Sequence, residues 1–382
     1  MMNSHRSVGF RILIFLVATF AIQDVRAQSV VPRAKIDVSA LGPQVGQRVP
    51  DFRLSDQFGR TQTLHSIMGA KGAMLVFIRS ADWCPYCKTQ LIELQSRVQD
   101  LKAKGFGVAV ISYDPVEILS AFTKQYGISF FMLSDVGSQT IRRYGILNTV
   151  AMELAGPNAK DPALADDIKT YVSVFGGNAR MAGIAFPGTF MLDRSGHVTS
   201  RFFEDSYITR TTVASVLMRA GRDSSPVTAT KIATEHLDVT AYPSDSSVAP
   251  GNRMTLAFDI VPHAGIHVYA PGASGYRIID VKLDAQPTFR VFPTQYPRSQ
   301  IYVFRPLNER VPVYERPFTL RQDVELDGMP ASQAALRGRE SVSLTGTLNY
   351  QACDATICFN PVSVPLAWTF TLRPILTERR VP

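Results

Sequence analysis

The first half of the chain alternates short apolar runs with segments whose apolar residues recur every three or four positions. Residues 73–78 are all apolar and predict a strand that is buried on both faces. The helical spacing that follows predicts a helix that begins at Cys84 and ends before Gly105. Further strands are expected at 108–111, 130–133, 188–192 and 197–203, and further helices at 116–126 and 210–219. We therefore predict an α/β domain over residues 46–220 around a mainly parallel sheet.

The second half of the chain alternates apolar and polar residues one by one, as strands with one buried face do. Residues 342–350 and 362–372 follow this period, and residues 254–261 predict another strand. No segment of this half predicts a convincing helix. We expect an antiparallel β-sandwich over residues 235–375, joined to the first domain by a polar linker at 221–234.

One segment, residues 148–183, interrupts the strand–helix alternation. Asp161-Pro162 predicts the start of a helix, and the apolar residues that follow it share one face. The segment is either an inserted helix that packs on the domain or a lid beside an active site.

The first residues have the features of a secretory signal peptide. Arg6 and Arg11 precede an apolar run at 12–22, and Val25-Arg26-Ala27 suits cleavage before Gln28. The run is too short to cross roughly 30 Å of hydrocarbon, so we expect no stable membrane insertion after cleavage. Residues 1–27 are thus predicted to be a signal peptide, and residues 28–45 a loose leader.

Composition narrows the classes of function. The chain has 382 residues, which predicts two or three domains, and a formal charge of +8, which falls to +6 without residues 1–27. It has no block of Lys or Arg, so we expect no nucleic-acid partner. Its four cysteines form two distant pairs, Cys84/Cys87 and Cys353/Cys358, and export would allow both to form disulfides.

The first cysteine pair lies where the predicted buried strand gives way to a helix. Cys84 begins the helix, Pro85 suits its first turn, and Cys87 follows within disulfide reach. The first-turn N–H groups and the helix dipole stabilise an anion, so we expect a depressed thiolate pKa at Cys84. Cys84 is then the nucleophile, and Cys87 resolves the mixed disulfide that it forms.

Two other interpretations of this pair stay open. One is a stabilising disulfide, although so short a loop contributes only about 2 kcal/mol. The other is half of a zinc site, although no Cys/His partner pair lies nearby. Asp82, Trp83 and Lys88 flank the dithiol as candidate tuning residues; the two charges either shift its pKa in opposite directions or are simply solvated.

The Cys84 motif and several other segments resemble one family. Residues 45–217 resemble the thioredoxin-like superfamily, in its peroxiredoxin-like AhpC/TSA (redoxin) branch. The segments that carry the resemblance are Val49-Pro50-Asp51-Phe52 with Asp56, Trp83-Cys84-Pro85-Tyr86-Cys87, Tyr126-Gly127-Ile128 with Leu133-Ser134-Asp135, and Phe186-Pro187-Gly188-Thr189-Phe190. The resemblance implies a thioredoxin-like fold, and it implies that Pro187 is a cis-proline that faces the active cysteine.

The chain departs from the peroxiredoxin pattern just before Cys84. Phe77 and Ala81 occupy the positions where peroxiredoxins carry a proline and a threonine or serine. The hydroxyl that helps to orient a peroxide is therefore missing, which argues against peroxidase activity. The Cys-Pro-Tyr-Cys motif instead resembles those of glutaredoxins and dithiol oxidoreductases.

The second cysteine pair lies between the two alternating strands. From its spacing alone it is either a clamp across a hairpin or a second redox site. Residues 237–373 resemble the immunoglobulin-like N-terminal domain of the DsbD thiol-reductant family, through Gly265-Ile266-His267-Val268-Tyr269, Leu348-Asn349-Tyr350-Gln351-Ala352-Cys353 and Cys358-Phe359-Asn360-Pro361. The resemblance implies a redox-active pair that passes electrons to periplasmic partners, and it favours a periplasmic location.

These features together predict an exported thiol–disulfide oxidoreductase with a thioredoxin-like α/β domain and an immunoglobulin-like β-sandwich. Its substrates would be protein thiols and disulfides, or small thiols and peroxides, and the second dithiol would exchange with the first or with a separate partner. The histidines lack metal-ligand spacing and no phosphate-binding glycine loop occurs, so we expect no metal and no cofactor. The alternatives are a thiol-dependent peroxidase and a non-enzymatic exported binding protein with two structural disulfides.

Overall fold

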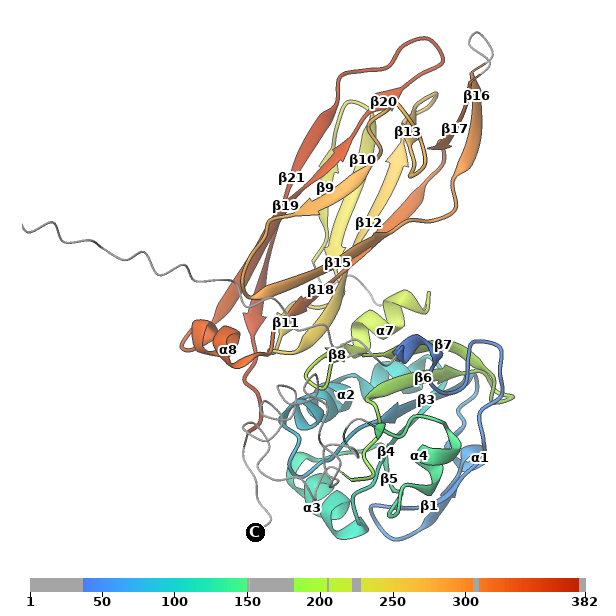
Figure 1. Ribbon diagram of the computed structural model, residues 1–382, viewed down its shortest axis with the longest axis vertical. Helices are drawn as coiled ribbons and strands as arrows, with labels where there is room; N and C mark the ends of the chain where they lie inside the picture. The colour runs from blue at the N-terminus through green and yellow to red at the C-terminus, as the bar shows by residue number, and fades with distance from the viewer. Residues whose placement is uncertain are drawn as a thin grey trace, which may run out of the picture. The chain divides into compact units, whose positions relative to one another are not determined.

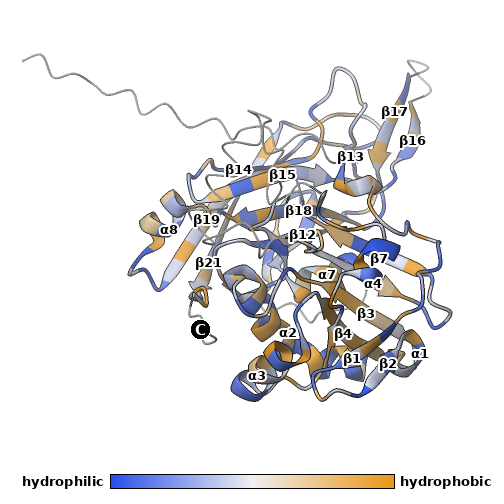
Figure 2. Ribbon diagram, turned by 60° about the horizontal axis from the view of Figure 1, so that its bottom comes forward, coloured by the Kyte–Doolittle hydropathy of each residue, from blue (hydrophilic) through white to orange (hydrophobic). Residues whose placement is uncertain are grey.

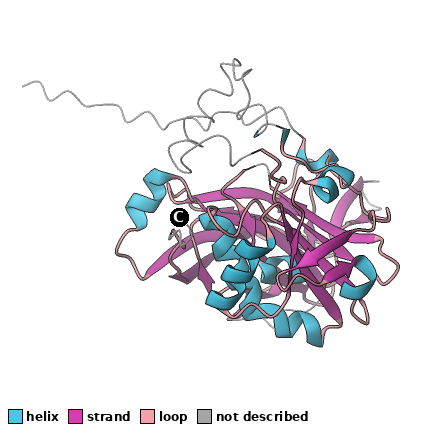
Figure 3. Ribbon diagram, turned by 90° about the horizontal axis from the view of Figure 1, so that it is seen from below, coloured by secondary structure: helices cyan, strands magenta, loops and turns pink. Residues whose placement is uncertain are grey.

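The computed structural model describes residues 37–149, 151, 182–204, 206–221, 228–304 and 309–377. The predicted signal peptide and most of the 148–183 insertion lie outside these residues. Strands make up most of the regular structure in the described part, and helices make up the rest (Figure 3). None of the helices described is long and apolar enough to cross a membrane.

Residues 37–221 fold around a seven-stranded sheet with the order β2-β1-β5-β4-β3-β6-β7 (Figure 1). Its strands are β1 (Arg53–Asp56), β2 (Thr61–Thr63), β3 (Gly72–Phe77), β4 (Phe106–Ser112), β5 (Phe131–Ser134), β6 (Gly188–Leu192) and β7 (Val198–Phe203). The central strands β3, β4 and β5 pair in parallel, whereas β1–β2 and β6–β7 are antiparallel hairpins at the two edges. β1 also pairs antiparallel with β5, and β6 with β3, so the prediction of a mainly parallel sheet is right for β3, β4 and β5 and wrong for the rest of the sheet.

The helices of this half are η1 (Val38–Ala40), α1 (Leu64–Ile67), α2 (Pro85–Ala103), α3 (Val116–Tyr126), α4 (Gln139–Arg143) and α7 (Val213–Arg219). Two of them, α2 and α3, lie close to their predicted positions, whereas η1, α1 and α4 were not predicted. α3 ends at Gly127, whose φ of 63° is a left-handed conformation that glycine adopts without strain. α7 begins later than predicted because Arg210–Thr211 form a short strand, β8, which pairs with β12 of the second half.

The core of this half lies on both faces of β3, whose six residues are all buried. Met74 and Val76 pack in a cluster with α2 residues such as Leu94, whereas Leu75 and Phe77 pack on the opposite face. Figure 2 accordingly shows β3 and β4 in predominantly hydrophobic colours. Burial on both faces explains why the sequence of β3 is continuously apolar.

Residues 228–377 form three further sheets, and their strand orders are β15-β18-β12-β10-β9 with β8 beside β12, β11-β21-β19-β14, and β16-β17-β13-β20. The strands are β9 (Thr230–Ala233), β10 (Leu237–Pro243), β11 (Ser247–Val248), β12 (Asn252–Pro262), β13 (His267–Tyr269), β14 (Asp280–Leu283), β15 (Phe289–Gln295), β16 (Gln300–Phe304), β17 (Glu309–Tyr314), β18 (Phe318–Leu326), β19 (Ser341–Tyr350), β20 (Ala352–Cys353) and β21 (Val362–Leu372). β19 and β21 pair antiparallel with their alternate residues buried, as predicted. The sheets enclose one large apolar cluster, consistent with a β-sandwich.

Three details differ from the sequence-based expectations. β9 lies inside the segment that was expected to be a linker, and it pairs with β10. A short helix, α8 (Pro330–Leu336), follows β18 in a half that was expected to lack helices. The predicted loose leader is held from residue 37 onward, because the Arg201 guanidinium donates hydrogen bonds to the carbonyl oxygens of Val38, Ser39 and Leu41.

Candidate active site

The first dithiol is a disulfide at the start of α2. Cys84 is the N-cap residue of the helix, Pro85 follows in its first turn, and the Cα atoms of Cys84 and Cys87 are 5.2 Å apart. The Cys84 sulfur accepts a hydrogen bond from the Cys87 backbone N–H at 3.1 Å. This is the position predicted from the sequence, and it places the Cys84 sulfur where the helix terminus favours negative charge.

Two buried arginines contact the sulfur atoms. Arg79 Nη2 lies 3.2 Å from Cys84 Sγ, and Arg210 Nη2 lies 3.2 Å from Cys87 Sγ. Both arginines also donate to the carbonyl oxygen of Tyr207, at 2.6 and 3.1 Å, which fixes their guanidinium groups. Once the disulfide is reduced, either guanidinium can stabilise a thiolate through a charge-assisted hydrogen bond.

Neither arginine was predicted from the sequence to belong to the site. Arg79 follows the buried apolar run at 73–78 and lies five residues before Cys84, so a charged residue at the end of a buried strand was a usable signal. Arg210 is 123 residues from Cys87 in sequence, and the pattern around it was interpreted as the first turn of a helix. Only the pairing of β8 with β12 positions it beside the sulfurs.

The residues predicted to tune the pKa of the dithiol do not all lie in the surroundings that were expected for them. Lys88 is buried, so its interpretation as a solvated charge is wrong, and Asp82 is half-buried. Trp83 is buried, and its ring N–H donates to the hydroxyl of Tyr113 at 2.8 Å. The contacts to sulfur that carry charge come from Arg79 and Arg210, and whether Asp82 or Lys88 tunes the dithiol stays a prediction.

A buried carboxylate holds the loop that leads to Cys84. Asp114, which follows β4, accepts hydrogen bonds from Ser80 Oγ at 2.8 Å, from the Ala81 N–H at 2.7 Å and from Ser112 Oγ at 2.9 Å. Burial raises the pKa of Asp114 to about 6, although these hydrogen bonds oppose the shift. Asp114 therefore positions the dithiol through the backbone, and the sequence analysis did not identify it.

The expectation of a cis-proline at Pro187 is wrong. No peptide bond among the described residues is cis, so the bond before Pro187 is trans. The Phe186 N–H bonds to the Ile146 carbonyl, and Gly188 is already in register with Phe77 of β3. The residues on both sides of Pro187 are thus paired with other parts of the chain, and the bond between them has the trans isomer, which X–Pro bonds favour by about 0.5–1 kcal/mol. That Pro187 faces the active cysteine stays a prediction.

The second dithiol is a disulfide whose two cysteines differ in exposure. Cys353 in β20 is buried, whereas Cys358 is exposed, and their Cα atoms are 4.0 Å apart. The hydroxyl of Tyr269 in β13 lies 3.1 Å from Cys353 Sγ and 3.3 Å from Cys358 Sγ. Tyr269 is therefore placed to donate a hydrogen bond to a thiolate at either cysteine, a role that the sequence analysis did not assign to it.

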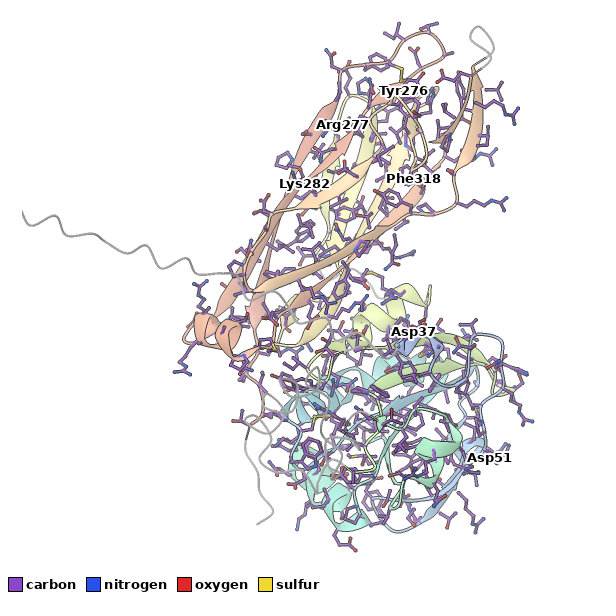
Figure 4. The ribbon with its side chains drawn as sticks, in the orientation of Figure 1. Asp37, Asp51, Tyr276, Arg277, Lys282 and Phe318 are labelled. Carbon is purple, nitrogen blue, oxygen red and sulfur yellow. A yellow bond between two sulfur atoms is a disulfide. The ribbon has the colours of Figure 1, made fainter. Side chains whose placement is uncertain are left out.

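Aromatic side chains line a pocket of about 120 Å³ beside this disulfide. The ring of Tyr276 stacks on that of Tyr269 with centroids 4.0 Å apart, and its hydroxyl donates to Glu309 at 2.7 Å. Figure 4 labels Tyr276 near the end of the sandwich that carries β13 and β20. The pocket and the exposed Cys358 make this disulfide accessible from solvent.

The two disulfides lie near opposite ends of β12. At its first residue, Asn252, the strand pairs with Arg210, which contacts the first dithiol. Its last residue, Pro262, pairs with Leu237, next to His236, whose ring packs on that of Phe359 beside Cys358. Eleven residues of strand span roughly 33 Å. In this conformation the two dithiols therefore cannot exchange directly.

Metal ligands do not converge anywhere in the described part of the chain: no group of three or more His, Cys, Asp or Glu side chains is placed to hold an ion.

Comparison with known proteins supports the two-part organisation. Residues 45–201 match the model of the AhpC/TSA family, and residues 236–365 match the model of the N-terminal region of thiol:disulfide interchange protein DsbD. Both resemblances noted in the sequence are confirmed, in the predicted order.

Two relatives show how far the similarity to known proteins extends. A chloroplastic peroxiredoxin Q of Populus jackii is 33% identical over 101 residues, which are 26% of this chain and 46% of the relative. Alkyl hydroperoxide reductase E of Mycobacterium bovis is 28% identical over 162 residues, 42% of this chain and 84% of the relative. The chain spans about half the length of the peroxiredoxin Q proteins that it matches. Among solved structures, AhpC of Enterococcus faecalis aligns with 47% of this chain and 91% of its own, at 19% identity and a TM-score of 0.35.

Proposed function

We propose that this chain, with its AhpC/TSA-type domain followed by a DsbD N-terminal-type domain, is an exported thiol–disulfide oxidoreductase of the periplasm. The observation that carries the proposal is the environment of the first dithiol. Cys84 caps the N-terminus of α2, and the guanidinium groups of Arg79 and Arg210 lie 3.2 Å from the two sulfurs. Each of these features favours a thiolate, which is the form that reacts.

The proposed reaction is thiol–disulfide exchange at Cys84. A thiolate of the partner attacks Cys84 Sγ, the bond between Cys84 and Cys87 breaks, and Cys87 leaves as a thiolate beside Arg210. A second partner thiol then releases Cys84, so that two electrons and two protons pass to the protein. This sequence oxidises the partner dithiol, and the reverse sequence, which starts from reduced Cys84 and Cys87, reduces a substrate disulfide; the potentials of the two pairs decide which one runs.

Cys353 and Cys358 form a second redox site in this proposal, with Tyr269 beside both sulfurs. Its exposure and its separation from the first dithiol favour exchange with a separate partner. An intramolecular relay between the two dithiols would require the sandwich to move relative to α2.

Redox titration of each pair tests the proposal. A catalytic dithiol should have a potential above about −300 mV, whereas a structural clamp should lie below that value. A Cys87→Ser variant should accumulate mixed disulfides with partner proteins at Cys84. A Cys84→Ser variant, which lacks the proposed nucleophile, should accumulate none at Cys87. Potentials below −300 mV for both pairs would instead support a binding protein with two structural disulfides.

A second candidate function is a thiol-dependent peroxidase, which the names of the similar proteins favour. Peroxide would oxidise Cys84 to a sulfenic acid, and Cys87 would resolve it with loss of water. Ala81 has no hydroxyl to orient the peroxide, and its N–H is already bonded to Asp114. Stopped-flow oxidation of the reduced protein separates the candidates, because a rate no faster than that of a free thiol rejects the peroxidase.

A further inference from the structure

The first disulfide is fully covered, unlike the second. Cys84 and Cys87 both have 0% of their surface exposed, whereas Cys358 is exposed. Exchange requires an attacking thiolate to reach a sulfur atom directly. The covering structure therefore decides which partners can react with Cys84.

One face of α2 is covered by residues of the second half of the chain. Tyr86, Thr89 and Glu93 are spaced three and four positions apart, so they share this face of the helix, and Tyr86 lies between the two cysteines in the sequence. Their hydrogen-bond partners are the Gly328 carbonyl at 2.7 Å, the Leu376 N–H at 3.3 Å and the Arg373 guanidinium at 3.3 Å, respectively.

Tyr86, inside the Cys-Pro-Tyr-Cys motif, packs against Gly251 and Gly328 and bonds to Gln333, and we call these three residues its seat. A Cβ atom at Gly251 would lie 3.0 Å from the Tyr86 ring, and one at Gly328 would lie 3.1 Å from it, so only glycine leaves the ring its present room. Gln333 of α8 donates to the Tyr86 hydroxyl at 3.0 Å. Tyr86 is consequently buried, although it is one of the two residues between the reactive cysteines.

We propose that the β-sandwich is an intramolecular cap on the Cys84–Cys87 dithiol, and that the seat formed by Gly251, Gly328 and Gln333 holds it closed. Dithiols of protein size exchange with Cys84 only after Tyr86 has left this seat. The proposal rests on the proposed function for the reaction that occurs at Cys84, whereas the cap itself concerns only whether a partner can reach the sulfur atoms. It makes the sandwich a specificity device for the first site as well as the carrier of the second.

The test compares two reductants on the two disulfides of one full-length, oxidised protein. Reduced thioredoxin is the large probe and dithiothreitol is the small one; each gives two electrons and two protons to a disulfide and becomes a disulfide itself. Quenching by alkylation and peptide mass spectrometry reports each pair separately. We expect the ratio of thioredoxin rate to dithiothreitol rate to be at least about 10-fold lower for Cys84–Cys87 than for Cys353–Cys358. Equal ratios at the two sites would overturn the cap.

Variants in the sandwich then open the cap without changing the redox residues. Gly328→Ala would place a methyl 2.4 Å from Ile208 and 3.1 Å from Tyr86, as a wedge, and Gln333→Ala removes one hydrogen bond to Tyr86. Each should raise the thioredoxin rate at Cys84–Cys87 by about 5–10-fold, since a hydrogen bond contributes about 1 kcal/mol. The rate at Cys353–Cys358 should stay unchanged, as should both rates in Gln295→Ala, which alters an exposed side chain of the same half.

Two outcomes separate the cap from the proposed function. An unchanged rate at Cys84–Cys87 in both variants overturns the cap, whatever the redox potentials are. Variants that accept electrons faster from thioredoxin, but whose Cys84–Cys87 pair has a potential below about −300 mV, support the cap and refute the proposed oxidoreductase activity.

Discussion

Arg79 offers the sharpest test of how the first dithiol is activated. Its Nη2 atom lies 3.2 Å from Cys84 Sγ and its side chain is fully buried, so its charge acts on the sulfur with little screening by water. In the reduced protein this contact becomes a hydrogen bond from a cation to a thiolate. We expect Arg79→Met to remove that stabilisation while keeping much of the apolar packing of the side chain.

The size of the effect follows from the geometry. A hydrogen bond to a charged group contributes about 1.5–3 kcal/mol. One pH unit corresponds to 1.36 kcal/mol, so the pH midpoint for alkylation of reduced Cys84 should rise by about 1–2 units. The reduced state loses the same free energy at neutral pH, which lowers the two-electron potential of the pair by about 30–60 mV.

Two measurements check this prediction. The rate of iodoacetamide alkylation of the reduced protein, followed against pH, gives the midpoint, and titration against glutathione gives the potential. Arg79→Lys should restore part of both values, whereas Arg53→Met, at an exposed position of the same sheet, should change neither. A stable Arg79→Met protein with an unaltered midpoint and potential would show that the helix terminus and Arg210 suffice, and our reasoning about Arg79 would be wrong.

Three further perturbations test other parts of the structure. Burial raises the pKa of Glu325 to about 7 from its ordinary 4.5, so between these pH values the folded protein keeps a proton that the unfolded chain releases. The free energy of unfolding should therefore fall as the pH rises from about 4.5 to 7. Urea unfolding of Glu325→Gln, measured over this range, should show a flatter decline. Asp114→Asn disturbs the three hydrogen bonds that hold residues 80–81 and 112, so it should lower the free energy of unfolding by about 1–3 kcal/mol and slow alkylation of Cys84. Tyr269→Phe removes the hydroxyl next to both sulfurs of the second pair and should lower the potential of that pair by about 20 mV, with no change in the first.

The sequence predicted those features that depend on local patterns. The position of Cys84 at the start of α2 follows from an apolar strand, a short loop and helical spacing within about thirty residues. β19 and β21 were likewise evident, because each alternates over about ten residues. Such patterns indicate which face of an element is buried, and the structure retains them.

The features that were missed depend on contacts between distant segments. Arg210 reaches Cys87 only because β8 pairs with β12, and no local pattern encodes that pairing. The residues that pair with Phe186 and Gly188, Ile146 and Phe77, are distant in sequence from the motif around Pro187. α8 is only seven residues long and has too few turns to show a period.

The placement of the two disulfides on one sandwich argues for two independent sites. At its first end, β12 is tied to the α/β half by Arg253, which bonds to Glu204 at 3.0 Å, and by Thr255, which bonds to Ser215 at 2.6 Å. Its other end leads into β13 and so to Cys353. Groups separated by far more than 10 Å, with no shared partners, generally contribute additively to free energies. Because β12 is paired with β10 and β18 on its two sides over residues 256–260, we expect a redox change at one end to leave the potential at the other end unaltered. Communication between the sites would therefore have to act through access, by release of the cap over Cys84, rather than through the potential of either pair.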